Sequence, residues 1–152
     1  MNLRLKVVRV GRGRTKWADA AVDDYAKRLK RHGKVEEVLI KPVLFKGDVD
    51  AVRRAEAEKI LKHASGTVVA LDERGRGLDS HAFAEVIQTA SLRSALTFVI
   101  GGAYGLDVSV RKASEHVIKL SDAVLNHEVA RVVLFEQVYR SVTLLKGIPY
   151  HH

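Results

Sequence analysis

Apolar and polar positions along the chain follow two periods, one typical of strands and one typical of helices. Residues 2–10 are predicted to form a strand. The next segment has apolar positions on one helix face, which predicts a helix that Thr15 could cap and Gly33 could end. Further strands are predicted over Val35–Ile40, Thr67–Leu71, Leu96–Ile100 and His116–Leu120. Further helices are predicted over Val49–His63, from Asp79 or Ser80 to about Leu92, from about Ser109, and from Asn126 to Lys146, where Gly147 and Pro149 follow. This alternation predicts an α/β fold with a mostly parallel sheet flanked by helices.

Two segments that follow predicted strands have the composition of a ligand site. Leu96–Ile100 runs into Gly-Gly-x-x-Gly at residues 101–105, and glycines there let a ligand approach the backbone closely. Residues 120–126 are mostly small or apolar, as an apolar cleft requires. Ligands of open α/β sheets lie at the carboxyl ends of strands, so both segments are candidates. Each also has a purely structural explanation, a tight turn for the first and an ordinary loop with Asn126 as helix cap for the second.

Two other glycine-containing segments are predicted to be loops. Gly11–Thr15 contains Arg12 and Arg14 but lacks the spacing of a phosphate-binding loop, so we interpret it as a flexible basic loop that can still contact phosphates. Asp72–Gly77 is a charged, glycine-rich turn between two regular elements. With little to bury, it is the best candidate for a mobile element.

The last helix combines a broad apolar surface with charged residues. The apolar cover is wider than one stripe needs, which predicts either a central helix or a dimer interface. Glu136 and Arg140 are four residues apart, the spacing of a surface ion pair. The tail at residues 147–152 is expected either to fray or to place its aromatic and histidine side chains on a base. No histidines have metal-ligand spacing, so no metal site is predicted.

Composition narrows the class of protein. The chain has 152 residues, 47% of them hydrophobic, and no linker or repeat divides it, so we expect one soluble domain over residues 1–152. The absence of cysteine excludes a disulfide scaffold, a thiolate zinc site and a cysteine nucleophile, and it suits a cytoplasmic protein. No signal peptide or membrane-spanning stretch is visible.

Net charge is concentrated in the first third of the chain. The formal net charge is +8 at pH 7. Residues 1–46 contain 13 Lys or Arg against 5 Asp or Glu, whereas residues 47–152 contain 13 of each. A localised basic surface favours nucleic-acid binding, although a basic solubilising face is the simpler alternative.

Several of these motifs, taken in order, resemble one family. They are Trp17 and Tyr25-x-x-Arg28 in the first helix, the strand end Val69–Asp72, Phe98–Leu106, Leu120-Ser121, residues 126–140, and Pro149-Tyr150-His151. Together they resemble the RlmH family, bacterial methyltransferases of the SPOUT or α/β-knot superfamily. The likeness covers essentially the whole chain, and the joint order of the motifs is far more specific than Gly-Gly-x-x-Gly alone.

The resemblance implies a C-terminal trefoil knot, a homodimer and a pocket for S-adenosyl-L-methionine. The implied cofactor-binding residues are Leu71, Gly102, Leu120, Ser121, Asp122, Ala123, Val124, Leu125 and Asn126. Gly102 would be glycine because a side chain would block the cofactor. The implied reaction is methylation of N3 of a pseudouridine in helix 69 of 23S rRNA on the assembled ribosome. Two alternatives stay open: a SPOUT methyltransferase with another RNA target, and a non-catalytic ribosome-associated RNA-binding module.

The resemblance also implies roles at the substrate side of the site. Arg140 would stabilise negative charge on the target base, and His151, His127 or water would accept its proton, a choice that the sequence leaves open. The predicted substrate-binding residues are Tyr150 and His152 in the tail, together with Arg12 and Arg14, because the basic first third of the chain would hold the RNA backbone. Relatives carry Arg or Lys where this chain has His152. An imidazole that is neutral at pH 7 is a weaker phosphate partner than a guanidinium, which leaves the role of the last residue open.

Overall fold

The computed structural model describes all residues from Met1 to His152 and alternates strands with helices. The elements are β1 (Leu3–Val10), α1 (Lys16–Lys30), β2 (Gly33–Ile40), α2 (Val49–His63), β3 (Thr67–Gly77), α3 (Ser80–Arg93), β4 (Leu96–Ile100), α4 (Val108–Ala113), β5 (His116–Lys119) and α5 (His127–Lys146). None of the helices combines the length and the apolar character that crossing a membrane requires.

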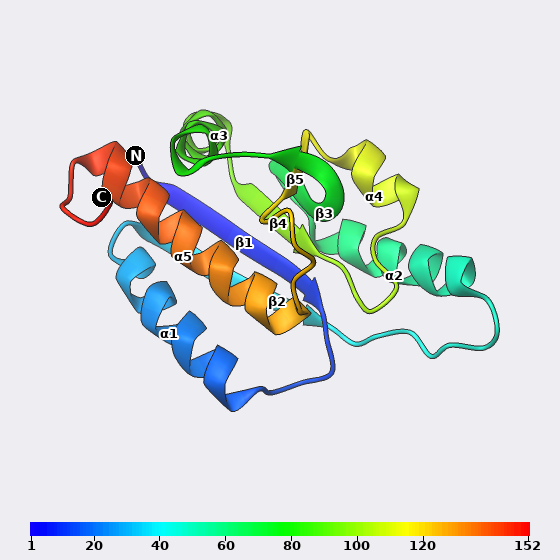
Figure 1. Cartoon of the computed structure of the whole chain (residues 1–152). Helices are drawn as coiled ribbons and strands as arrows, with labels where there is room; N and C mark the ends of the chain where they lie inside the picture. Colours follow the sequence, from blue (N-terminus) through cyan, green and yellow to red (C-terminus); the bar gives the residue numbers. More distant parts are fainter.

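The five strands form one sheet in the order β2-β1-β4-β3-β5, and every neighbouring pair is parallel. The predicted parallel sheet is therefore confirmed. Helices α1, α5 and α3 cover one face, with α5 between the other two, and α2 and α4 cover the opposite face (Figure 1). All five residues of β4 are buried, as the mostly apolar, β-branched run predicted.

Two apolar cores hold these layers together, one on each face of the sheet. The larger core joins β1, β3 and β4 to α1, α3 and α5, and in it the Phe83 and Phe98 rings stack with their centroids 5.7 Å apart. The smaller core joins the other face to α2 and α4. Because all strands run the same way, their carboxyl ends meet at one edge, and α5 runs back from that edge toward the end where both termini lie (Figure 1).

The loop predicted over Asp72–Gly77 is wrong, because β3 continues to Gly77. After Leu71 pairs with Ile118, the register shifts, and Arg76 pairs with the same residue of β5. Gly75 belongs to this close approach, since a Cβ there would lie 2.6 Å from the backbone nitrogen of Ile118. The glycine that suggested flexibility instead permits tight packing of β3 on β5.

The ends of α5 match their predicted signals. The Asn126 side chain accepts a hydrogen bond from the Glu128 N–H at 2.9 Å, and Gly147 ends the helix with a left-handed φ of 67°. Thr15 does precede α1, but its side chain makes no capping hydrogen bond.

Candidate functional site

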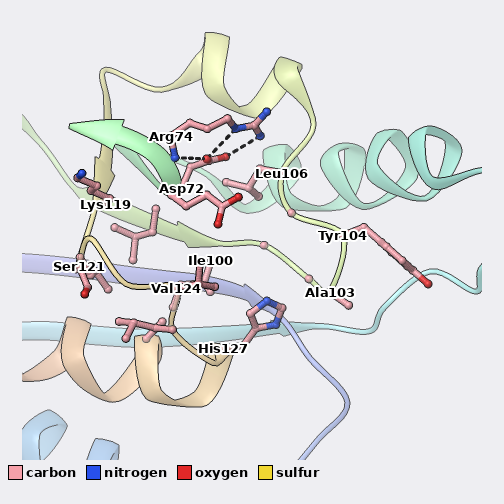
Figure 2. Close-up of a pocket in the computed structure, with 18 of the residues that line it drawn as sticks. Asp72, Arg74, Ile100, Ala103, Tyr104, Leu106, Lys119, Ser121, Val124 and His127 are labelled. Atoms are coloured by element: carbon pink, nitrogen blue, oxygen red, sulfur yellow. Dashed lines mark hydrogen bonds and ion pairs between the residues drawn. The ribbon is translucent and has the colours of Figure 1, made fainter. Parts of the chain in front are cut away.

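A cavity of about 560 Å³ opens at the carboxyl edge of the sheet, within the size range of small-molecule sites. Five chain segments line it: residues 71–74 of β3, the turn after β4, the loop after β5, the first residues of α5, and Arg53 of α2 (Figure 2). The two segments that the sequence singled out, residues 101–105 and 120–126, thus lie on the same cavity. We call this the cofactor pocket.

The cofactor pocket has an apolar floor and one charged wall. Leu71, Ile100 and Val124 supply apolar surface, while Asp72 and Arg74 lie together on the opposite side (Figure 2). Asp72 accepts hydrogen bonds from the Arg74 backbone N–H at 2.9 Å and from its Nε at 3.0 Å. Burial alone would raise the pKa of Asp72, but the hydrogen bonds from Arg74 outweigh it and hold that pKa below its usual value. Asp72 Oδ2 also accepts from Arg74 Nη2 at 3.1 Å and lies 3.6 Å from Arg111 Nη1, so the wall is a fixed, charge-balanced ion-pair group.

Most of the predicted cofactor-binding residues line this pocket. They are Leu71, Gly102, Leu120, Ser121, Ala123, Val124 and Leu125. The structure places two others outside the lining: Asp122 is exposed and forms an ion pair with Lys119, and Asn126 caps α5. Sequence reasoning missed Asp72 and Arg74 as lining residues, because their segment was assigned to a loop. Their position directly after an apolar strand is the signal that could have found them.

Gly102 is constrained by packing as well as by the pocket. A Cβ there would lie 3.0 Å from Val10 Cγ1 and 3.1 Å from Glu56 Oε1, so a side chain would press against β1 and α2. The expectation that only a cofactor requires this glycine is therefore incomplete. Gly105 has a different reason to be glycine, since its φ of 81° lies in the left-handed region.

A second and wider hollow of about 980 Å³ adjoins the cofactor pocket. The two share the Gly102–Tyr104 turn, Leu125 and His127. Arg12 and Arg14 line the second hollow, so the structure brings these predicted substrate-binding residues beside the cofactor pocket. We call it the basic hollow.

Three of the remaining predicted site residues, Arg140, Tyr150 and His151, form a separate group with Glu136, which we call the tail cluster. The predicted ion pair is confirmed, with Arg140 Nη2 2.7 Å from Glu136 Oε1. The Tyr150 hydroxyl donates to the same oxygen at 3.2 Å, and Arg140 Nη1 lies 3.0 Å from His151 Nδ1. Burial is the main cause that raises the pKa of Tyr150. The tail thus packs on α5, while His152 is exposed.

The tail cluster does not border the cofactor pocket of the same chain. Helix α5 starts at His127 on the pocket, and Arg140 lies 13 residues further along it. At a rise of 1.5 Å per residue, this separation is about 20 Å. Of the two candidate histidine bases, His127 borders the cofactor pocket and His151 lies with the tail cluster.

The basic first third of the chain also divides between the two ends of the sheet. Arg12, Arg14 and Lys41 follow β1 and β2 and border the basic hollow. Lys27, Arg28, Lys30, Arg31 and Lys34 lie at the other end, around the end of α1 and the start of β2. Arg9 faces neither, because its side chain is buried in ion pairs with Glu37 and Glu128. No three His, Cys, Asp or Glu side chains are grouped so as to hold a metal ion.

Fold and pocket together define a class of protein, an α/β enzyme with a ligand site at the carboxyl edge of a parallel sheet. The family model described as "Predicted SPOUT methyltransferase" matches residues 3–151. Proteins named ribosomal RNA large subunit methyltransferase H are similar over nearly full length. The one from Pelobacter propionicus is 39% identical, covering 99% of this chain and 100% of the relative, and the one from an Anaeromyxobacter species is 41% identical, covering 98% and 99%.

A solved structure supports the same architecture. The SpoU methyltransferase AviRb from Streptomyces viridochromogenes, in complex with AdoMet, aligns with a TM-score of 0.51 and 15% identity, covering 93% of this chain and 59% of that one. At this identity the likeness concerns the fold. The chain belongs to the SPOUT methyltransferase family and, within it, to the RlmH group. This confirms the predicted class, an enzyme that takes its methyl group from S-adenosylmethionine.

Proposed function

We propose that this enzyme methylates 23S rRNA in the cytoplasm, at N3 of a pseudouridine in helix 69 of the assembled ribosome. The observation that carries the proposal is the direct contact between the cofactor pocket and the basic hollow, which share the Gly102–Tyr104 turn. A methyl donor and an RNA strand bound there would meet at this turn. The choice of target rests on the resemblance and on the printed names of the relatives.

The cofactor pocket has the residues that S-adenosylmethionine requires. Leu71, Ile100 and Val124 offer apolar surface for an adenine ring, and the backbone at Gly101 and Gly102 can approach the ligand closely. Asp72 and Arg74, held together by hydrogen bonds, would form a fixed polar wall opposite this apolar surface. The bound cofactor would supply an electrophilic methyl group, and these residues would orient it.

The protein's own contribution to chemistry concerns the target base. N3 would bond to the methyl carbon as the bond from that carbon to the cofactor sulfur breaks, and the N3 proton must leave. Loss of this proton places negative charge on the flanking carbonyl oxygens until the new bond has formed. Arg140 would stabilise that charge with its guanidinium. His127, which borders both the pocket and the hollow, and His151 are the candidate proton acceptors. The base must be unstacked to reach this position.

We further propose that the working unit is a homodimer. The separation of about 20 Å between pocket and tail cluster along α5 means that one chain cannot apply Arg140 to its own cofactor. A second copy packed against α1 and α5 would bring its tail cluster to the pocket. Trp17 and Val129, large apolar side chains on these two adjacent helices, are 56% and 37% exposed and offer surface for such contact.

The proposed trefoil knot would involve β3 and β5. Residues 72–75 leave the ladder, and Arg76 then pairs with Ile118, as Leu71 does before it. In the proposed knot, the chain leading to α5 would pass beneath this irregular part of β3. We propose a single domain over residues 1–152, because both cores join elements from the two halves of the chain.

Nucleoside mass spectrometry of helix 69 tests the proposed target. We expect rRNA from a strain that lacks this protein to contain unmethylated pseudouridine, and we expect the wild-type gene to restore the methyl group. Full methylation without the protein would overturn the proposed target. Calorimetry with S-adenosylmethionine separates the enzyme from a non-catalytic RNA-binding module, which would show no binding.

Replacing Arg12 and Arg14 together by alanine is expected to weaken ribosome binding and to flatten its salt dependence. Each lost contact between a guanidinium and a phosphate lowers the number of counterions that binding releases. The slope of log affinity against log salt concentration should therefore fall by about 1 to 2 in magnitude. Filter binding at several salt concentrations measures it. Replacing Lys59 and Lys62 of α2 by alanine removes the same charge at exposed positions that do not line the basic hollow, and should leave the slope unchanged. An equal change in both variants would contradict the assignment.

A further inference from the structure

The basic hollow contains a pair of exposed aromatic rings that the proposed reaction does not use. Phe45 follows β2 and Tyr104 follows β4, and their ring centroids lie 5.7 Å apart at an angle of 36°. The two residues are 48% and 39% exposed. Tyr104 extends away from the other labelled residues of the cofactor pocket, outward from the turn that separates the two hollows (Figure 2).

We propose that Phe45 and Tyr104 form a stacking platform for an unpaired RNA base next to the methylation target. The inference rests on the proposed function, since it takes RNA as the substrate. Aromatic faces bind unpaired bases without sequence preference, because every base has a π-face to offer. One base would stack on the exposed rings while the neighbouring nucleotide enters the site beside Gly102.

Charge around the rings favours a nucleic acid over an uncharged partner. Arg12, Arg14 and Lys41 line the same hollow, and all three are exposed. Lys46, also exposed, directly follows Phe45. A groove that combines cations with aromatic faces matches the backbone and the bases of single-stranded RNA at once. The charge of the basic hollow therefore favours single-stranded RNA as its ligand.

Hydrogen bonds to α2 hold both sides of the platform in place. The carboxylate of Glu56, a residue only 4% exposed, accepts the Val43 N–H at 3.0 Å and so ties the segment that carries Phe45 to α2. On the other side, Arg53 Nε donates to the Tyr104 carbonyl oxygen at 2.7 Å. Both anchors come from α2, so one helix fixes the spacing of the two rings. A platform positioned before binding loses less conformational entropy when a base stacks on it.

Phe45 is the residue to test, because it lines the basic hollow but not the cofactor pocket. The probe is a short single-stranded RNA that contains one 2-aminopurine, whose fluorescence falls when the base stacks. We expect the wild-type protein to quench the probe, Phe45→Ala to bind it about tenfold more weakly with the quenching lost, and Phe45→Trp to restore both. Affinity for S-adenosylmethionine, measured by calorimetry, should be the same in all three proteins.

Leu44→Ala is the matched control, since it removes an adjacent apolar side chain that is 75% exposed and has no π-face. We expect less than about threefold weaker binding for it. Equal losses for both variants, or unchanged binding of Phe45→Ala, would overturn the platform. Loss of the dimer in Phe45→Ala, seen by sedimentation, would mean that a second copy covers the rings instead, which also overturns it.

The same measurements separate this inference from the proposed function. Binding of the probe needs no methyl transfer. If helix 69 proves fully methylated in the deletion strain while RNA affinity still depends on Phe45, the proposed target fails and the platform stands. If helix 69 loses its methyl group while Phe45→Ala binds and quenches like the wild type, the platform fails and the proposed target stands.

Discussion

Replacing Arg131 by methionine is expected to lower the free energy of unfolding by about 3–5 kcal/mol at neutral pH. Only 4% of this side chain is exposed, and it forms the centre of a charge cluster. Its Nε and Nη2 donate to the two Glu37 oxygens at 2.6 and 2.7 Å, and its Nη1 donates to Asp19 at 2.6 Å and Glu128 at 3.1 Å. Methionine would fill much of the volume but would leave these carboxylates with Arg9 as their one remaining cation.

The cluster matters because it joins four elements beneath the site. It links the starts of α1 and α5 to β1 and β2. Burial alone would lower the pKa of Arg131, but the hydrogen bonds to Glu37 and Asp19 outweigh it and raise that pKa above its usual value. The guanidinium therefore stays charged, and the first turn of α5, which carries His127, is held against the sheet.

Urea unfolding of Arg131→Met and wild type measures the effect, with Arg28→Met as the control. Arg28 pairs with Asp24 on the surface of α1, with side chains 42% and 60% exposed, and its loss should cost less than about 1 kcal/mol. Similar losses for both variants would show that the buried cluster contributes no more than a surface pair.

The difference in the free energy of unfolding between wild type and Arg131→Met should be smaller at acid pH than at neutral pH. The hydrogen bond from Arg131 is the main cause that lowers the pKa of Asp19 in the folded protein. A lowered folded pKa gives stability above the unfolded value of about 3.9, which is lost as the pH falls through the folded value. The variant lacks this contribution, and protonation relieves its carboxylate repulsion. Unfolding measured at pH 7 and in steps down to about pH 2 follows the change, and a difference that stays constant over this range would contradict the cluster.

Replacing Arg140 by alanine is expected to lower turnover by about 100- to 1000-fold while leaving cofactor affinity within about twofold. The reason is the placement of Arg140 in the tail cluster, about 20 Å from its own chain's cofactor pocket. Methyl transfer to ribosomes measures the first quantity and calorimetry the second. Arg140→Lys, which keeps the charge but loses the planar fork, should recover only part of the rate. Lost cofactor affinity with a normal rate would overturn the role.

Mixed dimers test where Arg140 acts. Ala130→Phe should fill the cofactor pocket from the first turn of α5 and abolish cofactor binding. When it is refolded together with Arg140→Ala, each mixed dimer would pair one intact pocket with the intact tail cluster of the other copy. We expect activity to reappear on mixing. A mixture as inactive as its components would mean that each chain uses its own Arg140.

Local patterns in the sequence accounted for the elements and for the side of the sheet that binds ligand. The alternation of apolar runs with helical periods predicted all five strands and their parallel arrangement. The glycines after β4 and the small residues after β5 then indicated the cofactor pocket, because parallel strands present their carboxyl ends at one edge. Each of these inferences needs only residues that are neighbours in the chain.

Local patterns failed where a residue's meaning depended on a distant partner. Asp72–Gly77 looked like a mobile loop, but Gly75 packs against the Ile118 backbone. The alternative in which the tail frays is wrong, because Tyr150 and His151 pack on Glu136 and Arg140 of α5. Neither contact can be predicted from the spacing of residues along the chain.

By itself, then, the sequence determined a parallel α/β sheet, a ligand site at its carboxyl edge, a concentration of basic charge, and through its motifs the family. The tertiary structure alone decided three further matters. It divided the basic residues between two ends of the sheet, buried Arg131 among acids from α1, β2 and its own helix, and separated Arg140 from the cofactor pocket. The physical reason is that charges and rings act through space over a few ångströms, and only the folded backbone sets those distances.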